Sequence, residues 1–288
     1  MKKDKIFSLL VYLFAILAIV VMFGIILSVF SEGLPLLNSI PLWAIITGTE
    51  WYPTFNPPSF GILPLICASL LVTFISAIFS VPLGIGSAIF LAEVAPAYLR
   101  NILKPMLELL VAIPSVVYGL FGMTVLSGFI MRLFKVPLGL NAFTAGILLG
   151  IMATPTIASV AEDAIFSVPV SIKEASIGIG ATKFETLYHI VLPAAKSGII
   201  TAIILGLSRA IGETMTVIMV AGGSPIIPHS IFDPVRPLTA TIAAEMGEAA
   251  HGSLHYHALF FIGAVLMTFT YVFNILGEWF RKRAIYRQ

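Results

Sequence analysis

The sequence predicts an all-α polytopic membrane protein with six transmembrane helices. Apolar residues make up 59% of its 288 residues and charged residues only 10%. A soluble domain carries about 25% charged residues, so this deficit indicates that most of the surface faces lipid. The apolar residues also gather in six long runs. The net charge is +2 and no basic patch is interleaved with aromatic residues, so nothing indicates a nucleic-acid partner.

Six segments reach the length of about 20 predominantly apolar residues that a membrane helix needs. We place them at about 7–30, 61–91, 105–131, 141–166, 195–222 and 256–280. The second and third are longer than a bilayer requires, so we expect them to tilt, kink or protrude. Proline removes a backbone donor and supplies the expected kink points, which are Pro64, Pro82, Pro114 and Pro155.

The first span begins like a secretory signal peptide. Lys2, Lys3 and Lys5 precede an apolar stretch that continues to Phe30. A signal peptide has an apolar core of about 7–15 residues followed by a small-residue cleavage site, and this stretch is longer and has no such site at the usual distance. We therefore expect a retained transmembrane helix.

Two long segments between spans, 31–60 and 223–255, are rich in proline, glycine and aromatic residues. They contain Trp51-Tyr-Pro53 in the first segment and Gly222-Gly-Ser-Pro225 at the start of the second. Glycine and proline clusters of this kind are typical of turns. We expect compact, capped loops rather than a separate domain.

Lysine and arginine are distributed unevenly between the predicted loops. With the N-terminus inside, Arg132, Lys135 and Arg236 lie outside, and Arg209 lies within a span. The positive-inside rule therefore places both termini and the loop 167–194 in the cytoplasm. The twelve cytoplasmic residues are Lys2, Lys3, Lys5, Arg100, Lys104, Lys173, Lys183, Lys196, Arg281, Lys282, Arg283 and Arg287.

The loop between the fourth and fifth spans carries a spaced motif. It contains Glu174-Ala175-Ser176, then Gly180, then Ile190-Val-Leu192-Pro193. Compared with the pattern E-A-A-x3-G-x9-I-x-L-P, it differs at one position, where serine replaces the second alanine. This run resembles the cytoplasmic coupling loop of ABC-importer permeases, which an ATPase grips.

The same residues predict the conformation of the loop. We expect a short amphipathic helix from Ser171, a break at Gly178–Gly180 and a second helix from Thr182 to Ile190. Glycine at the break permits backbone angles that other residues resist. Leu192-Pro193 would end the loop and begin the next span. Two short helices at an angle form a rigid knob that fits a cleft in a soluble partner; the alternative is an ordinary interfacial helix-turn-helix.

The fifth predicted span contains two charged residues, Arg209 and Glu213. A charge at the centre of a bilayer costs about 2.5–3.5 kcal/mol on insertion scales, so such residues usually have a function. Four residues apart on a helix, they share a face. The guanidinium suits a tetrahedral oxyanion, and Thr214 and Thr216 add neutral hydroxyls. The alternative is a structural ion pair that only lets the helix insert.

Other candidate sites are weaker. His251, His255 and His257 have spacing that a metal site uses, but histidines of a membrane-boundary loop explain them better. Glu162 and Asp163 are expected to cap helices or to face the ATPase. No Walker A, H-E-x-x-H or G-x-S-x-G run is present, so the chain is expected to be no enzyme and to bind no cofactor. ATP and Mg²⁺ would bind to a partner subunit.

Taken together, these motifs resemble the C-type permease subunit of phosphate ABC importers, the Pst system. The resemblance covers nearly all of the chain. The segments that carry it, besides the coupling loop, are Trp51–Pro53, Phe60–Ile66, Ile113–Gly122, Ser208–Met215, Leu238–Glu245 and Gly252–Tyr256.

The resemblance implies the fold, partners and path residues. It implies the type I ABC importer permease fold, with a core at residues 61–288 (five transmembrane helices) preceded by an N-terminal helix and extracytoplasmic loop at residues 1–60. It implies a second, A-type permease subunit, two cytoplasmic ATPase subunits and an extracytoplasmic phosphate-binding protein in a prokaryotic inner membrane. It also implies that Arg209 and Glu213 take part in phosphate passage.

Four alternatives remain open. In sulfate and molybdate permeases the corresponding motif resembles Arg-Ala-x-Gly-Glu followed by Phe-Gly. This chain instead has Thr214-Met215 after Glu213. The sister A-type subunit is a nearer rival, and the Trp51 loop and the segment 238–256 favour the C-type. An ion-coupled secondary carrier would use Glu213 as a proton relay. The coupling loop disfavours this class, because a secondary carrier needs no docking site for an ATPase. A membrane-embedded enzyme is the remaining class.

Overall fold

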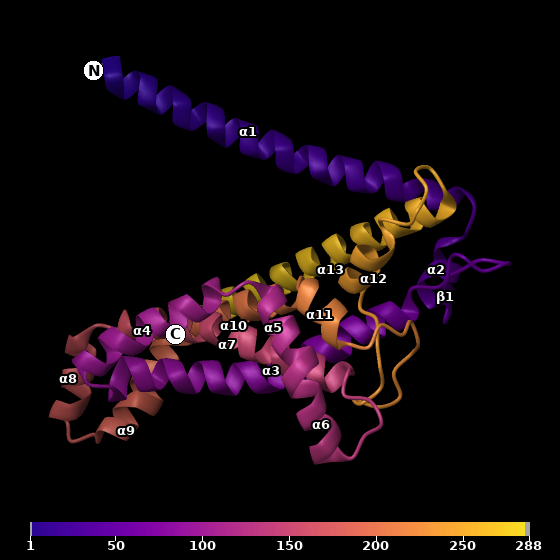
Figure 1. Ribbon diagram of the computed structural model, residues 1–288. Coiled ribbons are helices and arrows are strands. Elements are labelled where there is room, and N and C mark those ends of the chain that lie inside the picture. The colour runs from indigo at the N-terminus through magenta and orange to yellow at the C-terminus, as the bar shows by residue number, and fades with distance from the viewer. Residues whose placement is uncertain (1, 286–288) are drawn as a thin grey trace.

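The computed structural model describes the backbone of residues 2–285 and the side chains of residues 7–283. The described chain is mostly helical, with one short two-stranded hairpin (Figure 1). Its helices are α1 (Lys2–Gly33), α2 (Leu42–Thr47), α3 (Leu63–Ile89), α4 (Ala97–Ala112), α5 (Ser115–Phe121), α6 (Ser127–Phe134), α7 (Ala142–Phe166), α8 (Val170–Gly178), α9 (Lys183–Thr186), α10 (Leu192–Ile211), α11 (Met215–Val220), α12 (Leu238–Glu245) and α13 (Leu254–Ile285). The shorter elements are η1 (Leu34–Asn38), η2 (Phe90–Val94), η3 (Gly122–Leu126), η4 (Leu187–Val191), β1 (Trp51–Tyr52) and β2 (Ser59–Phe60).

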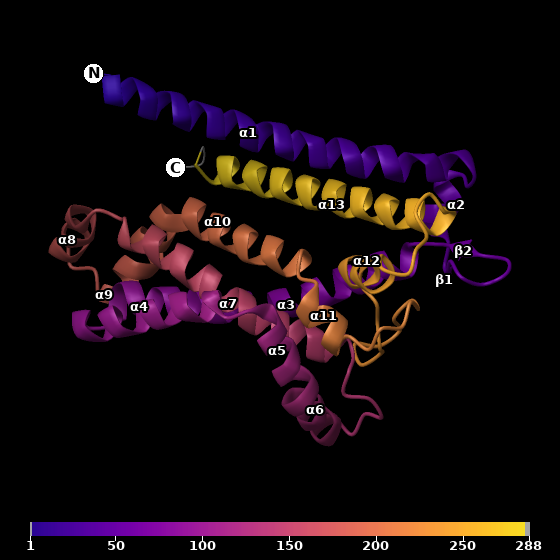
Figure 2. The ribbon, with the colours of Figure 1, turned by 45° about the horizontal axis from the view of Figure 1, so that its top comes forward.

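Six helical segments of the described chain are long and apolar enough to cross a membrane, which confirms the predicted number. Figures 1 and 2 show both chain termini at the end of the bundle that carries α8 and α9, which we call the loop end. The β1–β2 hairpin lies at the opposite end, the hairpin end. The spans are Phe7–Asn38, Leu63–Val94, Ser115–Phe134, Ala142–Phe166, Lys183–Ile211 and Leu254–Arg283.

The third span begins later than predicted. Residues 105–112 belong to the separate helix α4, and the span starts at Ser115. The cause is Pro114, because a residue before proline is driven out of the helical region, and Ile113 is extended with ψ 128°. Figure 2 shows α5 and α6 turning away from the line of α4.

The fifth span also differs from the predicted segment 195–222. At one end it begins at Lys183, because α9, η4 and α10 form one continuous helix. Leu192-Pro193 begins α10 as predicted, with Pro193 in its first turn directly after the π turn η4, where the regular hydrogen-bond ladder is already interrupted. The difference is that no break in the helix precedes it, since α9 and η4 run on into α10. At the other end the helix stops at Ile211, and residues 212–214 separate it from α11.

The centre of the bundle is α7, which has the largest buried share of the six spans. It packs along α3, and small residues allow the close approach: a Cβ added to Gly146 would lie 2.5 Å from the Ile75 side chain. Apolar clusters fill the middle of the bundle, the hairpin end around Leu259 and the loop end around Ile165. This packing fixes α7 between the loop end and the middle of the bundle.

The hairpin end is closed by a compact cap. Trp51 pairs with Phe60 across the hairpin and is 1% exposed. Its indole nitrogen donates to both carboxylate oxygens of Glu245, at 3.1 and 3.0 Å, and this carboxylate is also bonded by Arg236 (2.6 Å) and His255 (2.9 Å). The turn of the hairpin reaches beyond the helix ends in both views (Figures 1 and 2).

Candidate functional site

The loop between α7 and α10 has the predicted helix–break–helix conformation. The helix α8 ends at Gly178, and Gly180 has φ +97°, a left-handed conformation that glycine adopts without strain. Thr182 then caps α9 in a capping box, in which its hydroxyl accepts from the backbone of Glu185 and the Glu185 carboxylate accepts from the backbone of Thr182. The two helices are therefore set at a defined angle by a glycine and a cap.

Ser176, the one residue that departs from the motif, fastens the two halves of this loop together. It is 8% exposed, and its hydroxyl lies 2.9 Å from that of Thr186 in α9. Its carbonyl also accepts from the backbone of Ala181 at 3.2 Å. Serine at this position therefore adds a hydrogen bond that alanine lacks.

The other motif residues lie on two neighbouring helices. Glu174 and Ala175 are exposed on α8, whereas Ile190 and Leu192 are half-buried where α9 continues into α10. Pro193 is exposed at the same junction. The motif thus marks both helices of the knob, and Ser176 and Thr186 hold them together.

An apolar surface covers the tip of the knob, and we call it the apolar tip. Ile179 is 88% exposed, and the rings of Phe184 and Tyr188 are stacked with centroids 6.4 Å apart. Exposed apolar surface of this kind marks a contact with a partner or with lipid. The apolar tip consists of Ile172, Ile177, Ile179, Phe184 and Tyr188.

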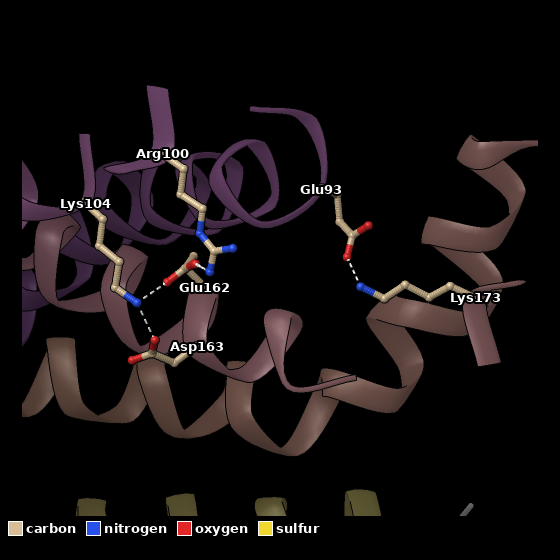
Figure 3. A network of polar contacts seen from close by, with 6 residues as sticks. All are labelled: Glu93, Arg100, Lys104, Glu162, Asp163 and Lys173. Carbon is tan, nitrogen blue, oxygen red and sulfur yellow. Dashed lines mark hydrogen bonds and ion pairs between the residues drawn. The ribbon is translucent and has the colours of Figure 1, made fainter. Parts of the chain in front are cut away.

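A network of ion pairs lies beside the knob (Figure 3). Glu162 of α7 is fully buried and accepts from Arg100 and Lys104 of α4, the latter at 2.6 Å. Lys104 also bonds Asp163 at 2.5 Å, and the Arg100 guanidinium lies over the ring of Phe166. These acidic residues therefore fasten α4 to α7, and neither of the roles expected from the sequence is needed to explain them.

This network stabilises the charged form of Lys104. Its partial burial alone would lower its pKa, but the hydrogen bonds and charges of Asp163 and Glu162 outweigh burial and raise the pKa above 10.5. The stabilisation is therefore present below pH 10.5 and is lost only as the pH rises through the higher folded-state value. In the sequence, this network is indicated by Arg100 and Lys104, two cations spaced four residues apart on one amphipathic helix.

The prediction that Arg209 and Glu213 share one helix face is wrong, and the alternative of a structural ion pair between them is not observed among the described side chains either. The helix α10 ends at Ile211, so the two residues do not share a helix face, and no ion pair between them is present in the described chain. Arg209 instead donates to the Thr156 hydroxyl at 3.3 Å and to the Val111 carbonyl at 3.2 Å. The break at Pro114 leaves that carbonyl free of the helix ladder.

Glu213 begins the next helix rather than pairing with a cation. Its carboxylate accepts from the backbone of Thr216 at 3.2 Å, and its carbonyl accepts from the Thr239 hydroxyl. The Thr216 hydroxyl is buried and donates to the Ser115 carbonyl at 3.0 Å, whereas the Thr214 hydroxyl donates to the Gly212 carbonyl at 3.3 Å. Arg209 and Glu213 nonetheless border one gap, together with Leu149, Met152, Ala153 and Ala210, and this gap is too small to hold a water molecule in this conformation.

The three histidines do not gather into a metal site. His255 bonds Glu245, the His257 ring lies 2.7 Å from the carbonyl of Glu32, and His251 packs edge-on against Tyr256. No group of three potential metal ligands occurs among the residues whose placement is described. Each histidine therefore has a structural contact in the cap.

One family model matches most of the chain, including the loop 167–194 and Arg209. Residues 80–286 match the model described as binding-protein-dependent transport system inner membrane component, and the chain belongs to this family. It is a multi-pass inner-membrane protein and a permease subunit of an ABC importer rather than an enzyme.

Individual relatives agree with this class. The chain is 39% identical to the probable ABC transporter permease YqgH of Bacillus subtilis, over 86% of this chain and 80% of the relative. It is 36% identical to the phosphate transport system permease protein PstC of Pasteurella multocida, over 77% of this chain and 75% of the relative. With PstC of Mesorhizobium japonicum the identity is 32% over 97% of this chain and 90% of the relative.

Solved structures confirm the fold. A bacterial alginate ABC transporter aligns with a TM-score of 0.66 at 14% identity, over 94% of both chains. The methionine ABC transporter MetNI, in an inward-facing conformation, aligns with a TM-score of 0.60 at 20% identity, over 75% of this chain and 93% of that chain. The predicted type I importer permease fold is therefore correct.

Proposed function

We propose that this chain is the C-type permease subunit of an ATP-driven phosphate importer and forms half of its translocation path. Relatives named as phosphate transport permeases support the substrate, and they align over most of the chain. The observation that carries the proposal is Arg209: a guanidinium at a helix break, held by two neutral acceptors and bordering an internal space. Such a cation is available to an oxyanion, because no carboxylate has to be displaced.

The path residues in this proposal are Arg209, Glu213, Thr214 and Thr216. Arg209 attracts the oxyanion and releases it, because a transient site serves conduction better than a tight one. Glu213 accepts a hydrogen bond from a protonated phosphate oxygen, which fully deprotonated sulfate does not offer. Thr214 supplies a hydroxyl, and Thr216 holds α11 against the start of α5, so that the wall of the path keeps its shape.

The knob formed by α8 and α9 is the proposed docking site for the ATPase. Its support is the apolar tip, which protrudes at the loop end and is joined rigidly through the hydrogen bond between Ser176 and Thr186. Exposed rings and aliphatic side chains gain free energy by entering a cleft of a protein partner. Within the knob we assign the contact to α8 and α9 and to the motif residues Glu174, Ala175, Ser176, Gly180, Ile190, Leu192 and Pro193.

The proposal includes an assembly and an orientation. One knob per permease and an ATPase pair with two clefts call for a second, A-type permease, two ATPases and an extracytoplasmic phosphate-binding protein. Both termini and the knob face the cytoplasm, as the positive-inside rule predicts. Residues 61–288 form the permease core, and residues 1–60 add a helix and an extracytoplasmic loop.

The test is ATP-driven uptake of labelled phosphate by the chain reconstituted with these partners. We expect arsenate to compete and sulfate to have no effect, because arsenate shares the protonated oxygen of phosphate. Uptake that prefers sulfate or molybdate would overturn the substrate assignment and keep the importer class. Uptake that follows a proton gradient without the ATPase would contradict the coupling mechanism.

A further inference from the structure

We propose that the ion pair between Glu93 and Lys173 is the joint that fastens the knob to α3, so that the ATPase moves two spans together. Lys173 lies in α8, and Glu93 lies in η2 at the loop end of α3. Figure 3 shows the two side chains reaching toward each other across the gap between these elements. The inference rests on the proposed docking of the knob to an ATPase.

The helix α8 has few other attachments. Within it only Ser176 is buried, and that side chain bonds Thr186 inside the same knob. Ser176 bonds α8 to Thr186 at the start of the fifth span, and among the described side chains Lys173 makes the only hydrogen bond or ion pair from α8 to any other span. Without the contact of Lys173 with Glu93, α8 would be held to the bundle by its two chain connections and by its packing on α9 and η4.

The joint is partly shielded from water. The Lys173 side chain is 18% exposed and that of Glu93 is 21% exposed. Ion pairs at fully exposed positions contribute little because solvent and salt screen them, whereas partial burial reduces the screening. The position of Glu93 is also fixed, because the helix ends after η2, where Ala95 is extended before Pro96.

The second half of the knob is attached in a different way. The helix α9 continues through η4 into α10, so its movement passes along the backbone. Leu187 and Val191 also pack into the apolar cluster at the loop end, with Ala88 of α3 and Ile165 of α7. Thus α9 drives α10 directly, and Lys173 adds α3 to the same movement.

This second connection leads toward the path. The helix α3 packs along α7, and α7 carries Thr156, which holds the Arg209 guanidinium. A displacement of α3 therefore changes the contact between α7 and α10 beside Arg209. The consequence of the joint is a direct link from α8 to α3, which adds to the packing of α3 against η4 and α10.

Charge exchange tests the joint in the complete importer reconstituted in proteoliposomes. Glu93→Lys and Lys173→Glu each place like charges together, and we expect phosphate uptake per ATP hydrolysed to fall about fivefold or more. The double variant Glu93→Lys with Lys173→Glu restores opposite charges and is expected to return within about twofold of the unmodified chain. A merely local structural role would not predict recovery of the uptake-to-ATP ratio.

The matched control is the pair of Glu278 and Lys282 within α13, which joins no two elements. Glu278→Gln is expected to leave the ratio unchanged. Where Glu93→Lys assembles poorly, Glu93→Gln removes the pair with less disturbance. The inference would be overturned by unchanged phosphate uptake per ATP in both Glu93 variants. It would also be overturned if an assembled double variant did not recover the uptake per ATP.

A second readout separates this joint from docking itself. With Cys67 replaced by serine, an Ile179→Cys variant reports the contact of the apolar tip with the ATPase by crosslinking. We expect this crosslink to persist in Glu93→Lys; its loss would show that the pair shapes docking and would overturn the inference. Failure of the unmodified tip to crosslink would instead contradict the proposed ATPase site. If another oxyanion is the cargo, the same variants are measured with it.

Discussion

At the scale of the residue, polar side chains of this protein gather where helices end. Arg209 lies in the last turn of α10 and finds its acceptors at the end of α4 and on α7. The sequence predicts that Arg209 is special, because an arginine within a span is costly. Its acceptors were not predictable, since they depend on a break 95 residues away, between Ala112 and Ser115.

Replacing Arg209 tests its place in the path. Arg209→Gln is expected to lower phosphate uptake by about 10–100-fold, because a charged hydrogen-bond donor is worth about 1.5–3 kcal/mol. Arg209→Lys, which keeps the charge but not the planar fork, is expected to give an intermediate rate. Uptake is measured alongside recovery of the assembled complex, and normal uptake by Arg209→Gln would remove this residue from the path.

Glu162 offers a prediction about stability rather than transport. Glu162→Gln leaves Arg100 and Lys104 without their shared carboxylate. We expect the free energy of unfolding to fall by about 3 kcal/mol, because a buried ion pair is broken. Asp163→Asn is the matched control, since that side chain is 64% exposed and its pair with Lys104 is worth less than about 1 kcal/mol. Thermal unfolding of the purified chain in detergent measures both, and equal melting temperatures would contradict the assignment.

At the scale of the element, apolar length predicts which segments are helices but not where they stop. Six spans and the turn at Gly180 follow from composition and glycine placement. Two helix ends do not: Pro114 divides one predicted span, and the break after Ile211 divides another. Proline and glycine occur both inside and between helices, so only tertiary contacts decide which of them interrupts the chain.

The angle between α8 and α9 is predicted to depend on Gly180. Gly180→Ala forces a residue with a side chain into the left-handed region, at a cost of about 1–2 kcal/mol, and we expect lower transport and weaker stimulation of the ATPase. The cause is strain and not crowding, because no atom lies within 4 Å of the added Cβ. Gly178→Ala is the control, since this site has equal space and helical geometry.

Both glycine variants are compared by insertion into the membrane and by uptake. Insertion is expected to be equal, since neither residue lies in a span. Equal transport by Gly180→Ala and Gly178→Ala would mean that the angle between α8 and α9 is not under mechanical constraint.

At the scale of the whole molecule, the two ends of the bundle differ in character. The loop end holds the termini, the knob and the ion pairs of Glu93 and Glu162, whereas the hairpin end holds the cap around Trp51. This division agrees with the distribution of lysine and arginine in the sequence. The side of the membrane that each end faces is a separate prediction.

Labelling tests that orientation. In a chain with Cys67→Ser, Phe55→Cys at the hairpin is expected to react with a membrane-impermeant maleimide in intact spheroplasts, because Phe55 is 63% exposed. Ile179→Cys at the knob is expected to react only after permeabilisation. The reverse pattern would invert the topology and would exclude docking of a cytoplasmic ATPase at the knob.

The continuous helix from Lys183 to Ile211 has a mechanical consequence. Its 29 residues form a rod of about 40 Å that carries Phe184 at one end and Arg209 at the other. A rod of this length works as a lever: a tilt of about 5° at a central pivot moves each end sideways by about 1.7 Å, in opposite directions. A displacement of about that size along the two contacts of Arg209, which are 3.3 and 3.2 Å long, is enough to take the guanidinium out of reach of its acceptors although the tilt is imposed far from the cargo.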